Sequence, residues 1–207
     1  MLAQQYFQEN AARWKEIRAM HVAEADLENE FMHAVGDTAY EAFLDIGTGT
    51  GRILELLANQ VERGIGIDTS TEMLSLARAT LEQAGIKHVH VRKGDMYNLP
   101  IDDATIDLAT LHLVLHYSMD PAQVLTEACR TLKPDGRLII VDFAPHDEDS
   151  LRTEHQHQRL GFNDKEIKTI LKSLGLRVEK TRKLSGDPLT VNIWAAAKPT
   201  SSDNRLH

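Results

Sequence analysis

Short apolar runs alternate with longer stretches of helical spacing along most of the chain. Apolar runs of five to seven residues, bounded by glycine or polar clusters, predict buried strands. The predicted strands are residues 42–46, 64–68, 88–92, 106–112 and 137–143. The intervening stretches place apolar residues at helical spacing, over residues 52–59, 70–84 and 121–132. Alternation of strands with helices predicts an α/β fold built on a parallel, doubly wound sheet.

The last part of the chain follows a different pattern. A helix capped by Asn163 or Asp164 is predicted to end at Gly175. Two apolar runs, residues 177–184 and 189–197, then flank a polar turn. Two runs joined in this way predict an antiparallel hairpin that completes the sheet.

The chain start and the chain end lie outside this alternation. Residues 3–35 contain no proline or glycine, so residues 1–40 are predicted to be a helical segment that lies over one end of the sheet. The main domain is expected over residues 41–198. The polar residues 199–207 are expected to form a flexible tail.

Composition and charge narrow the classes of function. The chain has 31 acidic and 23 basic residues, a net charge of −8, which disfavours nucleic acid as a partner. We find no signal peptide and no apolar run of the ~20 residues that a membrane helix needs. A cytoplasmic protein is therefore expected. The single cysteine, Cys129, excludes an internal disulfide, and its helical surroundings indicate a buried apolar residue.

The first predicted strand ends in a glycine-rich turn, Gly47-Thr48-Gly49-Thr50-Gly51. Glycines let the backbone turn sharply and let a ligand approach closely. A dinucleotide fingerprint needs a third glycine where this chain has Arg52, and the lysine of a phosphate-binding P-loop is absent. The turn therefore resembles nucleotide-binding turns in general, but it lacks the residues typical of NAD-binding and ATP-binding turns. Read alone, it is equally consistent with a tight strand–helix connection.

Acidic residues follow the next two predicted strands. Asp68 ends the second strand, where a carboxylate can accept hydrogen bonds from ribose hydroxyls. Asp95 and Met96 follow the third strand, where they can contact an adenine amino group and ring. The carboxyl ends of parallel strands meet at one edge of a sheet, so these side chains and the glycine turn are expected to share one nucleoside site.

These segments resemble the motifs of class I S-adenosylmethionine-dependent methyltransferases. The matching stretches are residues 44–51, 66–74, 94–100, 107–112 and 132–138. The resemblance implies a Rossmann-like, seven-stranded sheet, mostly parallel with a C-terminal antiparallel hairpin. It also implies S-adenosyl-L-methionine as cofactor and a methyltransferase activity. The motifs say little about the methyl acceptor, for which an unidentified small molecule is the preferred hypothesis.

Within that family the chain looks closest to the methyltransferase part of bacterial ArsR-type regulator fusion proteins. The stretches behind this likeness are Tyr6-Phe7 with Trp14, and residues 115–117, 141–146, 154–157 and 160–162. The roughly 40 residues before the first predicted strand are not expected to hold the winged helix of those regulators. A single cysteine argues against arsenite methylation, which requires several. Quinone-ring methyltransferases look like more distant relatives.

The resemblance and the strand ends together give a set of expected cofactor-binding residues. The set is Tyr6, Phe7, Asp45, Gly47, Thr48, Gly49, Gly51, Asp68, Thr69, Met73, Gly94, Asp95, Met96 and His112. Tyr6 and Phe7 are expected to cover the bound cofactor, or else to pack as ordinary core. Arg18 and His21 are candidates to hold the methionine carboxylate.

Four residues near the ends of the fourth and fifth strands are the candidates for catalysis: His112, His116, Asp142 and His146. Methyl transfer from a sulfonium needs alignment first, and needs a base only if the acceptor carries a proton at attack. His112 is the first choice, as base or as a hydrogen-bonding partner of the acceptor. A structural histidine is the alternative reading for His112 and for His116.

No metal site is expected. His155 and His157 are two residues apart, unlike the i, i+4 pair of a helical metal site, so a solvated helix face or a lid fits them better. A non-catalytic sensor of the cofactor is the main alternative to an enzyme. A nicotinamide oxidoreductase is a third hypothesis.

Overall fold

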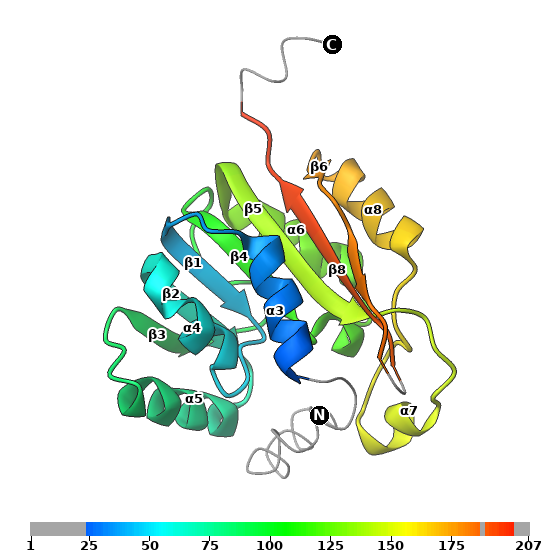
Figure 1. Cartoon of the computed structure of the whole chain (residues 1–207), viewed down its shortest axis with the longest axis horizontal. Coiled ribbons are helices and arrows are strands. Elements are labelled where there is room, and N and C mark those ends of the chain that lie inside the picture. Colours follow the sequence, from blue (N-terminus) through cyan, green and yellow to red (C-terminus); the bar gives the residue numbers. More distant parts are fainter. Residues whose placement is uncertain (1–23, 187–188, 201–207) are drawn as a thin grey trace.

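Eight strands in the described part of the chain form one sheet, in the order β3-β2-β1-β4-β5-β8-β6, with β7 also paired to β8. The computed structural model describes residues 24–186 and 189–200. The strands are β1 (Tyr40–Ile46), β2 (Val61–Asp68), β3 (Val89–Lys93), β4 (Ile106–His112), β5 (Leu132–Phe143), β6 (Arg177–Val178), β7 (Arg182–Leu184) and β8 (Val191–Ala197). The first five are parallel, and β8 runs antiparallel to β5, β6 and β7. The predicted mixed α/β sheet is confirmed (Figure 1).

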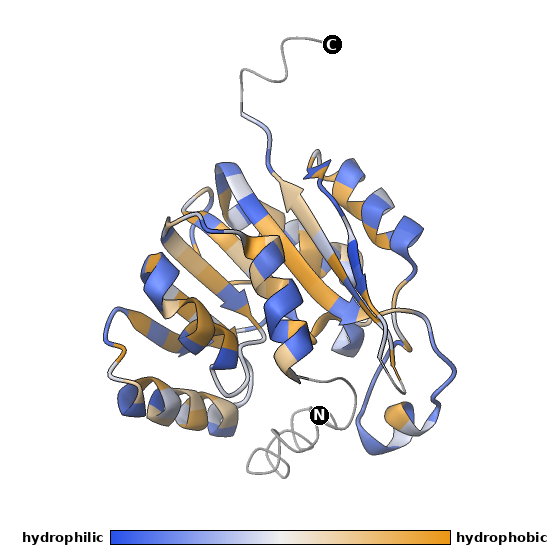
Figure 2. Ribbon diagram, viewed as in Figure 1, coloured by the Kyte–Doolittle hydropathy of each residue, from blue (hydrophilic) through white to orange (hydrophobic). Residues whose placement is uncertain are grey.

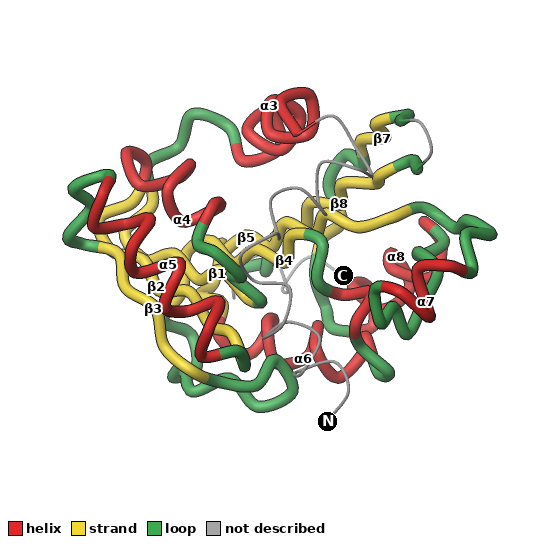
Figure 3. Tube along the Cα trace, turned by 90° about the horizontal axis from the view of Figure 1, so that it is seen from below, coloured by secondary structure: helices red, strands yellow, loops and turns green. Residues whose placement is uncertain are grey.

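Helices cover both faces of the sheet. The helices are α3 (Glu24–Val35), α4 (Arg52–Leu57), α5 (Thr71–Gln83), α6 (Pro121–Thr131), α7 (Ser150–Glu154) and α8 (Asp164–Ser173), with short 3-10 turns η2 (Ala58–Gln60) and η3 (Leu115–Tyr117). Helices α3 and α4 lie on one side of the sheet and α6 and α8 on the other (Figure 3). The sheet therefore separates two hydrophobic cores.

Alternation along the central strands fills these two cores. On β5, Ile139 and Val141 belong to the core shared with α3 and α4, whereas Leu138 and Ile140 belong to the core shared with α6 and α8. A strand buried on both faces has no polar side, which explains the continuous apolar runs in the sequence. Figure 2 shows the same arrangement, with apolar central strands between helices that are polar on their outer sides.

Local capping explains where several helices begin and end. The Ser70 side chain accepts a hydrogen bond from the Met73 N–H at 3.2 Å and so begins α5. Asn163, one of the two predicted caps, accepts from the Lys165 N–H at 2.9 Å and begins α8. Gly175, with φ +76°, follows the end of α8 as predicted.

Two segments differ from the sequence prediction. Leu132, predicted as the end of a helix, and residues 133–136, predicted as a turn, are incorporated into β5, with a register shift against β4 and a positive φ of 63° at Asp135. The predicted strand 177–184 is interrupted, so the sheet has eight strands where seven were expected. The pairing register on β8 shifts by one residue between β6 and β7. An extra residue of this kind is a β-bulge, which locally breaks the ladder.

Several sequence predictions concern the ends of the chain. Residues 24–35 are helical, as expected for part of the N-terminal segment, whereas residues 1–23 and 201–207 lie outside the described residues. The boundaries proposed for the main domain, 41–198, stay a prediction. Within the described ranges, no helix is long and apolar enough to cross a membrane.

Candidate active site

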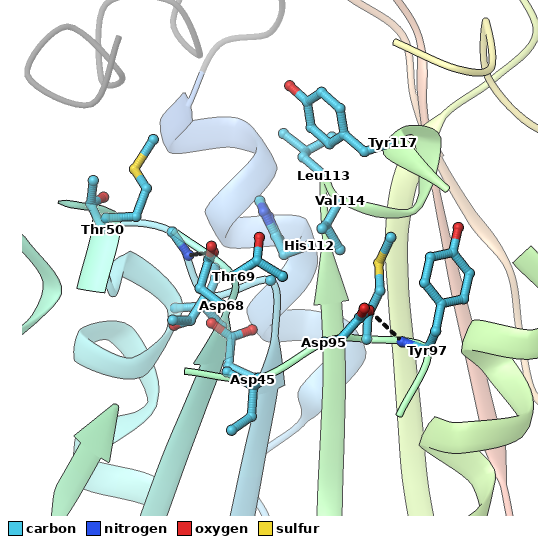
Figure 4. Close-up of a pocket in the computed structure, with 18 of the residues that line it drawn as sticks. Asp45, Thr50, Asp68, Thr69, Asp95, Tyr97, His112, Leu113, Val114 and Tyr117 are labelled. Atoms are coloured by element: carbon cyan, nitrogen blue, oxygen red, sulfur yellow. Dashed lines mark hydrogen bonds between the residues drawn. The ribbon is translucent and has the colours of Figure 1, made fainter. Parts of the chain in front are cut away.

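A cavity of about 470 Å³ opens at the carboxyl ends of the parallel strands. It lies where β1 has β2 on one side and β4 on the other, so the strand order reverses there, the usual place for a ligand in an open parallel sheet. Figure 4 shows Asp45, Asp68 and Asp95 toward one end of the cavity and Leu113, Val114 and Tyr117 toward the other, with His112 between them. The cavity therefore has an acidic end and a more apolar end.

The glycine turn after β1 forms part of the acidic end. Gly47, Gly49 and Gly51 have φ values of +71°, +53° and +82°, which favour glycine. A Cβ atom on Gly47 would lie 2.2 Å from Cγ2 of Val114. The backbone N–H groups of Gly47 and Thr48 donate to the Ile67 carbonyl at 2.8 and 3.0 Å. The turn is thus fixed by main-chain contacts to β2.

Asp68 accepts two main-chain hydrogen bonds at the end of β2. Its Oδ2 accepts from the Gly49 N–H and its Oδ1 from the Ser70 N–H, both at 2.9 Å. A carboxylate oxygen can accept more than one hydrogen bond, so both oxygens keep acceptor capacity toward the cavity. Burial raises the pKa of Asp68, and the N–H donors oppose that rise.

The other two acidic residues are held differently. Asp45 is buried, and its Oδ1 accepts from the Thr110 hydroxyl at 2.7 Å. Asp95 is exposed, and its Oδ1 accepts from the Tyr97 N–H at 2.9 Å in a local turn. The backbone after β3 therefore fixes Asp95 at the edge of the cavity beside Met96.

His112 and Arg52 connect the cavity to α3. The His112 ring packs edge-on against Phe31, with ring centroids 5.5 Å apart, and its side chain is largely buried. Arg52 donates two hydrogen bonds to Glu28, at 2.6 and 2.7 Å, and one to Glu55 at 2.9 Å. Helix α3 therefore contacts two residues that line the cavity.

The other three candidate catalytic residues do not line the cavity. Asp142 and His116 are buried behind its wall and bind each other, with 2.8 Å between His116 Nδ1 and Asp142 Oδ1. His146 accepts from the Glu148 N–H at 3.2 Å, and burial lowers its pKa. Asp142, expected to point toward the cavity, thus points into the core below η3.

The cavity brings together eleven of the sequence-predicted residues. These are Asp45, Gly47, Thr48, Gly49, Asp68, Thr69, Met73, Gly94, Asp95, Met96 and His112. Gly51 lies behind the turn, where a Cβ atom would come within 3.0 Å of Ala77 on α5. Tyr6 and Phe7, with Trp14, Arg18 and His21, lie outside the described residues.

Sequence reasoning did not assign several lining residues to the site. They are Thr50, Arg52, Ile53, Ile67, Tyr97, Leu113, Val114, Tyr117, Met119 and Gln158. Most are neighbours of predicted residues, so extending each motif by one or two positions finds them. Gln158 has no such signal, because it reaches the cavity from the loop after α7. Across the residues that the structure describes, no three His, Cys, Asp or Glu side chains are grouped to hold a metal ion.

Comparison with known proteins identifies the domain. The crystal structure of YcgJ from Bacillus subtilis superposes with a TM-score of 0.72 at 19% identity, covering 84% of this chain and 98% of that one. At this identity the likeness shows the fold. Residues 44–140 match the family model described as a methyltransferase domain. Residues 44–140 thus match a methyltransferase domain, in a chain that has the class I methyltransferase fold.

Other proteins share parts of this methyltransferase domain. YcgJ, an uncharacterized methyltransferase, is 33% identical over 105 residues, which cover 50% of this chain and 42% of YcgJ. An uncharacterized 37.1 kDa protein in transposon TN4556 of Streptomyces fradiae is 45% identical over 103 residues, covering 48% and 29%. A demethylmenaquinone methyltransferase of Lactiplantibacillus plantarum is 37% identical over 109 residues, covering 51% and 46%. In sequence, the match thus spans less than half the length of each of these relatives.

Proposed function

We propose that the protein transfers the methyl group of S-adenosylmethionine to an uncharged small molecule bound at the apolar end of the cavity. The observation that carries the proposal is the shared cavity itself. The glycine turn, Asp68 and Asp95 follow three neighbouring strands and line one space, and His112 lies next to them at the end of β4.

The acidic end of the cavity fits the donor. Asp68 has acceptor capacity left for the two ribose hydroxyls, and Asp95 with Met96 can take the adenine amino group and ring. Asp45 and the carbonyls of the glycine turn can take the methionine amino group. The acidic residues also suit the positive charge of a sulfonium. This arrangement leaves the space around residues 112–119 for the acceptor.

The apolar end of the cavity limits the charge of the acceptor. Arg52 is the one Lys or Arg among the described lining residues, and two carboxylates already neutralise it. An acceptor with a carboxylate or phosphate would therefore be desolvated there without a cationic partner, which is costly. Leu113, Val114 and Tyr117 instead fit an apolar or ring-containing molecule. The demethylmenaquinone methyltransferase among the relatives is consistent with an acceptor of this kind.

The chemistry requires little of the protein beyond alignment. The sulfonium is an activated donor, so the cavity walls have to hold donor and acceptor in line and exclude water. We assign to His112 either the removal of an acceptor proton or a hydrogen bond that orients the acceptor. His116 and Asp142, buried behind the wall, are not assigned contact with the reacting atoms.

Further parts of the proposal rest on the sequence. We propose a cytoplasmic protein without a nucleic-acid partner, since the net charge is −8. We also propose that its nearest functional relatives are the methyltransferase parts of ArsR-type fusion proteins, on the strength of the stretches around Leu115-His116-Tyr117 and residues 141–146.

Two measurements test the proposal. Calorimetry should show binding of S-adenosylhomocysteine and none of NAD; the reverse result would contradict the proposal and favour the nicotinamide oxidoreductase. Labelled methyl incorporation from S-adenosylmethionine into a neutral metabolite extract should then exceed incorporation into the acidic fraction of the same extract. Cofactor binding with no turnover in either fraction would favour the non-catalytic sensor.

A further inference from the structure

The His116–Asp142 pair is a buried polar contact that the proposed chemistry does not use. Both side chains are almost completely inaccessible, at 2% and 0% exposure. Asp142 accepts from His116 Nδ1 at 2.8 Å, from the His116 N–H at 3.2 Å and from the Phe143 N–H at 2.8 Å. A buried carboxylate is tolerated only when it is hydrogen-bonded in this way. Each side chain therefore provides hydrogen bonds that the other needs in order to be buried.

The pair reaches the cavity through two neighbours of His116. The His116 carbonyl accepts from the Gln158 N–H at 3.0 Å and from the Arg159 N–H at 3.1 Å. Tyr117 follows His116 on η3, and both Tyr117 and Gln158 line the cavity. One residue thus joins β5, η3 and the loop after α7. Two wall residues from distant parts of the sequence are positioned by this single junction.

Ring packing surrounds the histidine on the remaining sides. The His116 ring lies 4.0 Å from the His157 ring, 4.2 Å from the Tyr117 ring and 5.1 Å from the Phe143 ring, centroid to centroid. Its Nε2 atom is buried and has no hydrogen-bond partner among the described residues. Both Asp142 oxygens also accept main-chain N–H groups, so the contact places an Nδ1–H donor on the ring, facing Asp142.

We propose that Asp142 and His116 are positioning residues for the acceptor end of the cavity. Asp142 accepts from the Nδ1–H group of His116, and His116 in turn fixes Tyr117 and Gln158 as facing parts of the wall. The assignment of this end of the cavity to the acceptor rests on the proposed function, whereas the contacts of His116 with Asp142 and Gln158 do not. Among the described residues, no hydrogen bond or ring contact joins the pair to the glycine turn or to Asp68, so we expect changes at the pair to leave the donor end in place.

The test compares two substitutions at His116 with Asp142→Asn. His116→Phe keeps a ring against His157 and Phe143 but removes the donor to Asp142. His116→Asn places an amide donor close to the position of Nδ1 and should restore the contact. His90→Asn, at an exposed position on β3, is the control. Asp142→Asn should resemble His116→Phe, because its amide nitrogen would face an N–H donor.

Hydrogen exchange and nitrogen NMR give the readouts, on the chain with and without S-adenosylhomocysteine. His116→Phe should speed exchange at the Gln158 and Arg159 amides by about tenfold or more, and His116→Asn should return it to within about threefold of the natural chain. Nitrogen spectra should show that Nδ1 of His116 carries a proton. The affinity for S-adenosylhomocysteine should stay within about twofold in both variants.

Each alternative result has a definite meaning. Natural exchange rates in His116→Phe would overturn the proposal, as would a His116 ring whose Nδ1 carries no proton. Failure of His116→Asn to restore protection would assign the effect to ring packing and overturn the role of the Asp142 contact. If Asp142→Asn does not fold, the two His116 variants still decide the question. If S-adenosylhomocysteine does not bind, the proposed function fails while the exchange comparison on the free chain remains valid.

Discussion

The two ends of the cavity are held in place by different kinds of contact. The acidic end consists of turns whose geometry is set by main-chain contacts, such as the Gly47 and Thr48 N–H groups on the Ile67 carbonyl. The apolar end consists of side chains on a 3-10 turn and a loop, joined through His116. Main-chain contacts tolerate sequence change better than side-chain contacts do. The donor end can therefore stay constant in a family while the acceptor end changes with the substrate.

The largest effect is expected at Gly47, where the two ends touch. Gly47→Ala combines a left-handed φ with a Cβ atom 2.2 Å from Val114, and should lower the free energy of unfolding by about 3 kcal/mol. Gly85 has a similar φ of +69° and open space around it, so Gly85→Ala should lower it by about 1 kcal/mol. Urea denaturation measures both. Equal losses would show that the contact between the two ends is unimportant, and Gly47→Ala with Val114→Ala should recover part of the larger loss.

A substitution at His112, which lies between the two ends of the cavity, separates catalysis from cofactor binding. His112→Ala should lower turnover on the active extract fraction by about a hundredfold, while the dissociation constant of S-adenosylhomocysteine changes by less than about threefold. Methyl incorporation and calorimetry measure the two quantities. His90→Ala, on the edge strand β3, serves as the matched control. Equal losses in turnover and affinity would make His112 a structural residue.

Asp68 tests the donor end alone. Asp68→Ala removes the proposed acceptor for two ribose hydroxyls, so it should weaken S-adenosylhomocysteine binding by more than about tenfold. Circular dichroism should show that the fold persists. Asp37 is exposed, and Asp37→Ala should bind normally. Unchanged affinity in Asp68→Ala would show that Asp68 does not bind the ribose. The assignment of the acidic end to the donor would then lose its support.

A smaller effect is expected from pH. Burial raises the pKa of Asp68 in the free protein, and ribose hydroxyls bind the ionised form better. Affinity for S-adenosylhomocysteine should therefore fall as the pH is lowered, beginning above the ordinary aspartate pKa of about 3.9. Calorimetry at pH 7 and pH 5 should show a loss of a few-fold. The same pH change should have less effect on Asp68→Ala, and an identical pH dependence would assign the titration to another group.

Features of the fold that depend on neighbouring residues could be predicted from the sequence. The Ser70 cap, the Gly175 stop and the strand ends at Asp68 and His112 each follow from a local pattern, and the structure confirms them. The donor end of the cavity was predictable for the same reason, since three consecutive strands deliver its residues to one edge.

Features that depend on pairing across the chain could not be predicted. Asp142 was expected at the cavity because it lies near the end of a strand, but it is buried in the core, where it binds His116, 26 residues earlier. The bulge between β6 and β7 depends on the register of β8, which apolar alternation does not encode. Gln158 is held in the wall by the His116 carbonyl, a contact without any local sequence signal. The acceptor end is therefore the part of the site that sequence describes least.

The bulge that divides β6 from β7 also bears on aggregation. A long, flat edge strand offers unpaired N–H and C=O groups on which a second chain can add. Here one edge of the sheet is cut into pieces of two and three residues that carry Arg177, Arg182 and Lys183. The opposite edge, β3, ends in Arg92 and Lys93. Short or charged edges disfavour intermolecular sheet extension, so the extra residue that interrupts the hairpin also protects the molecule from fibril-like association.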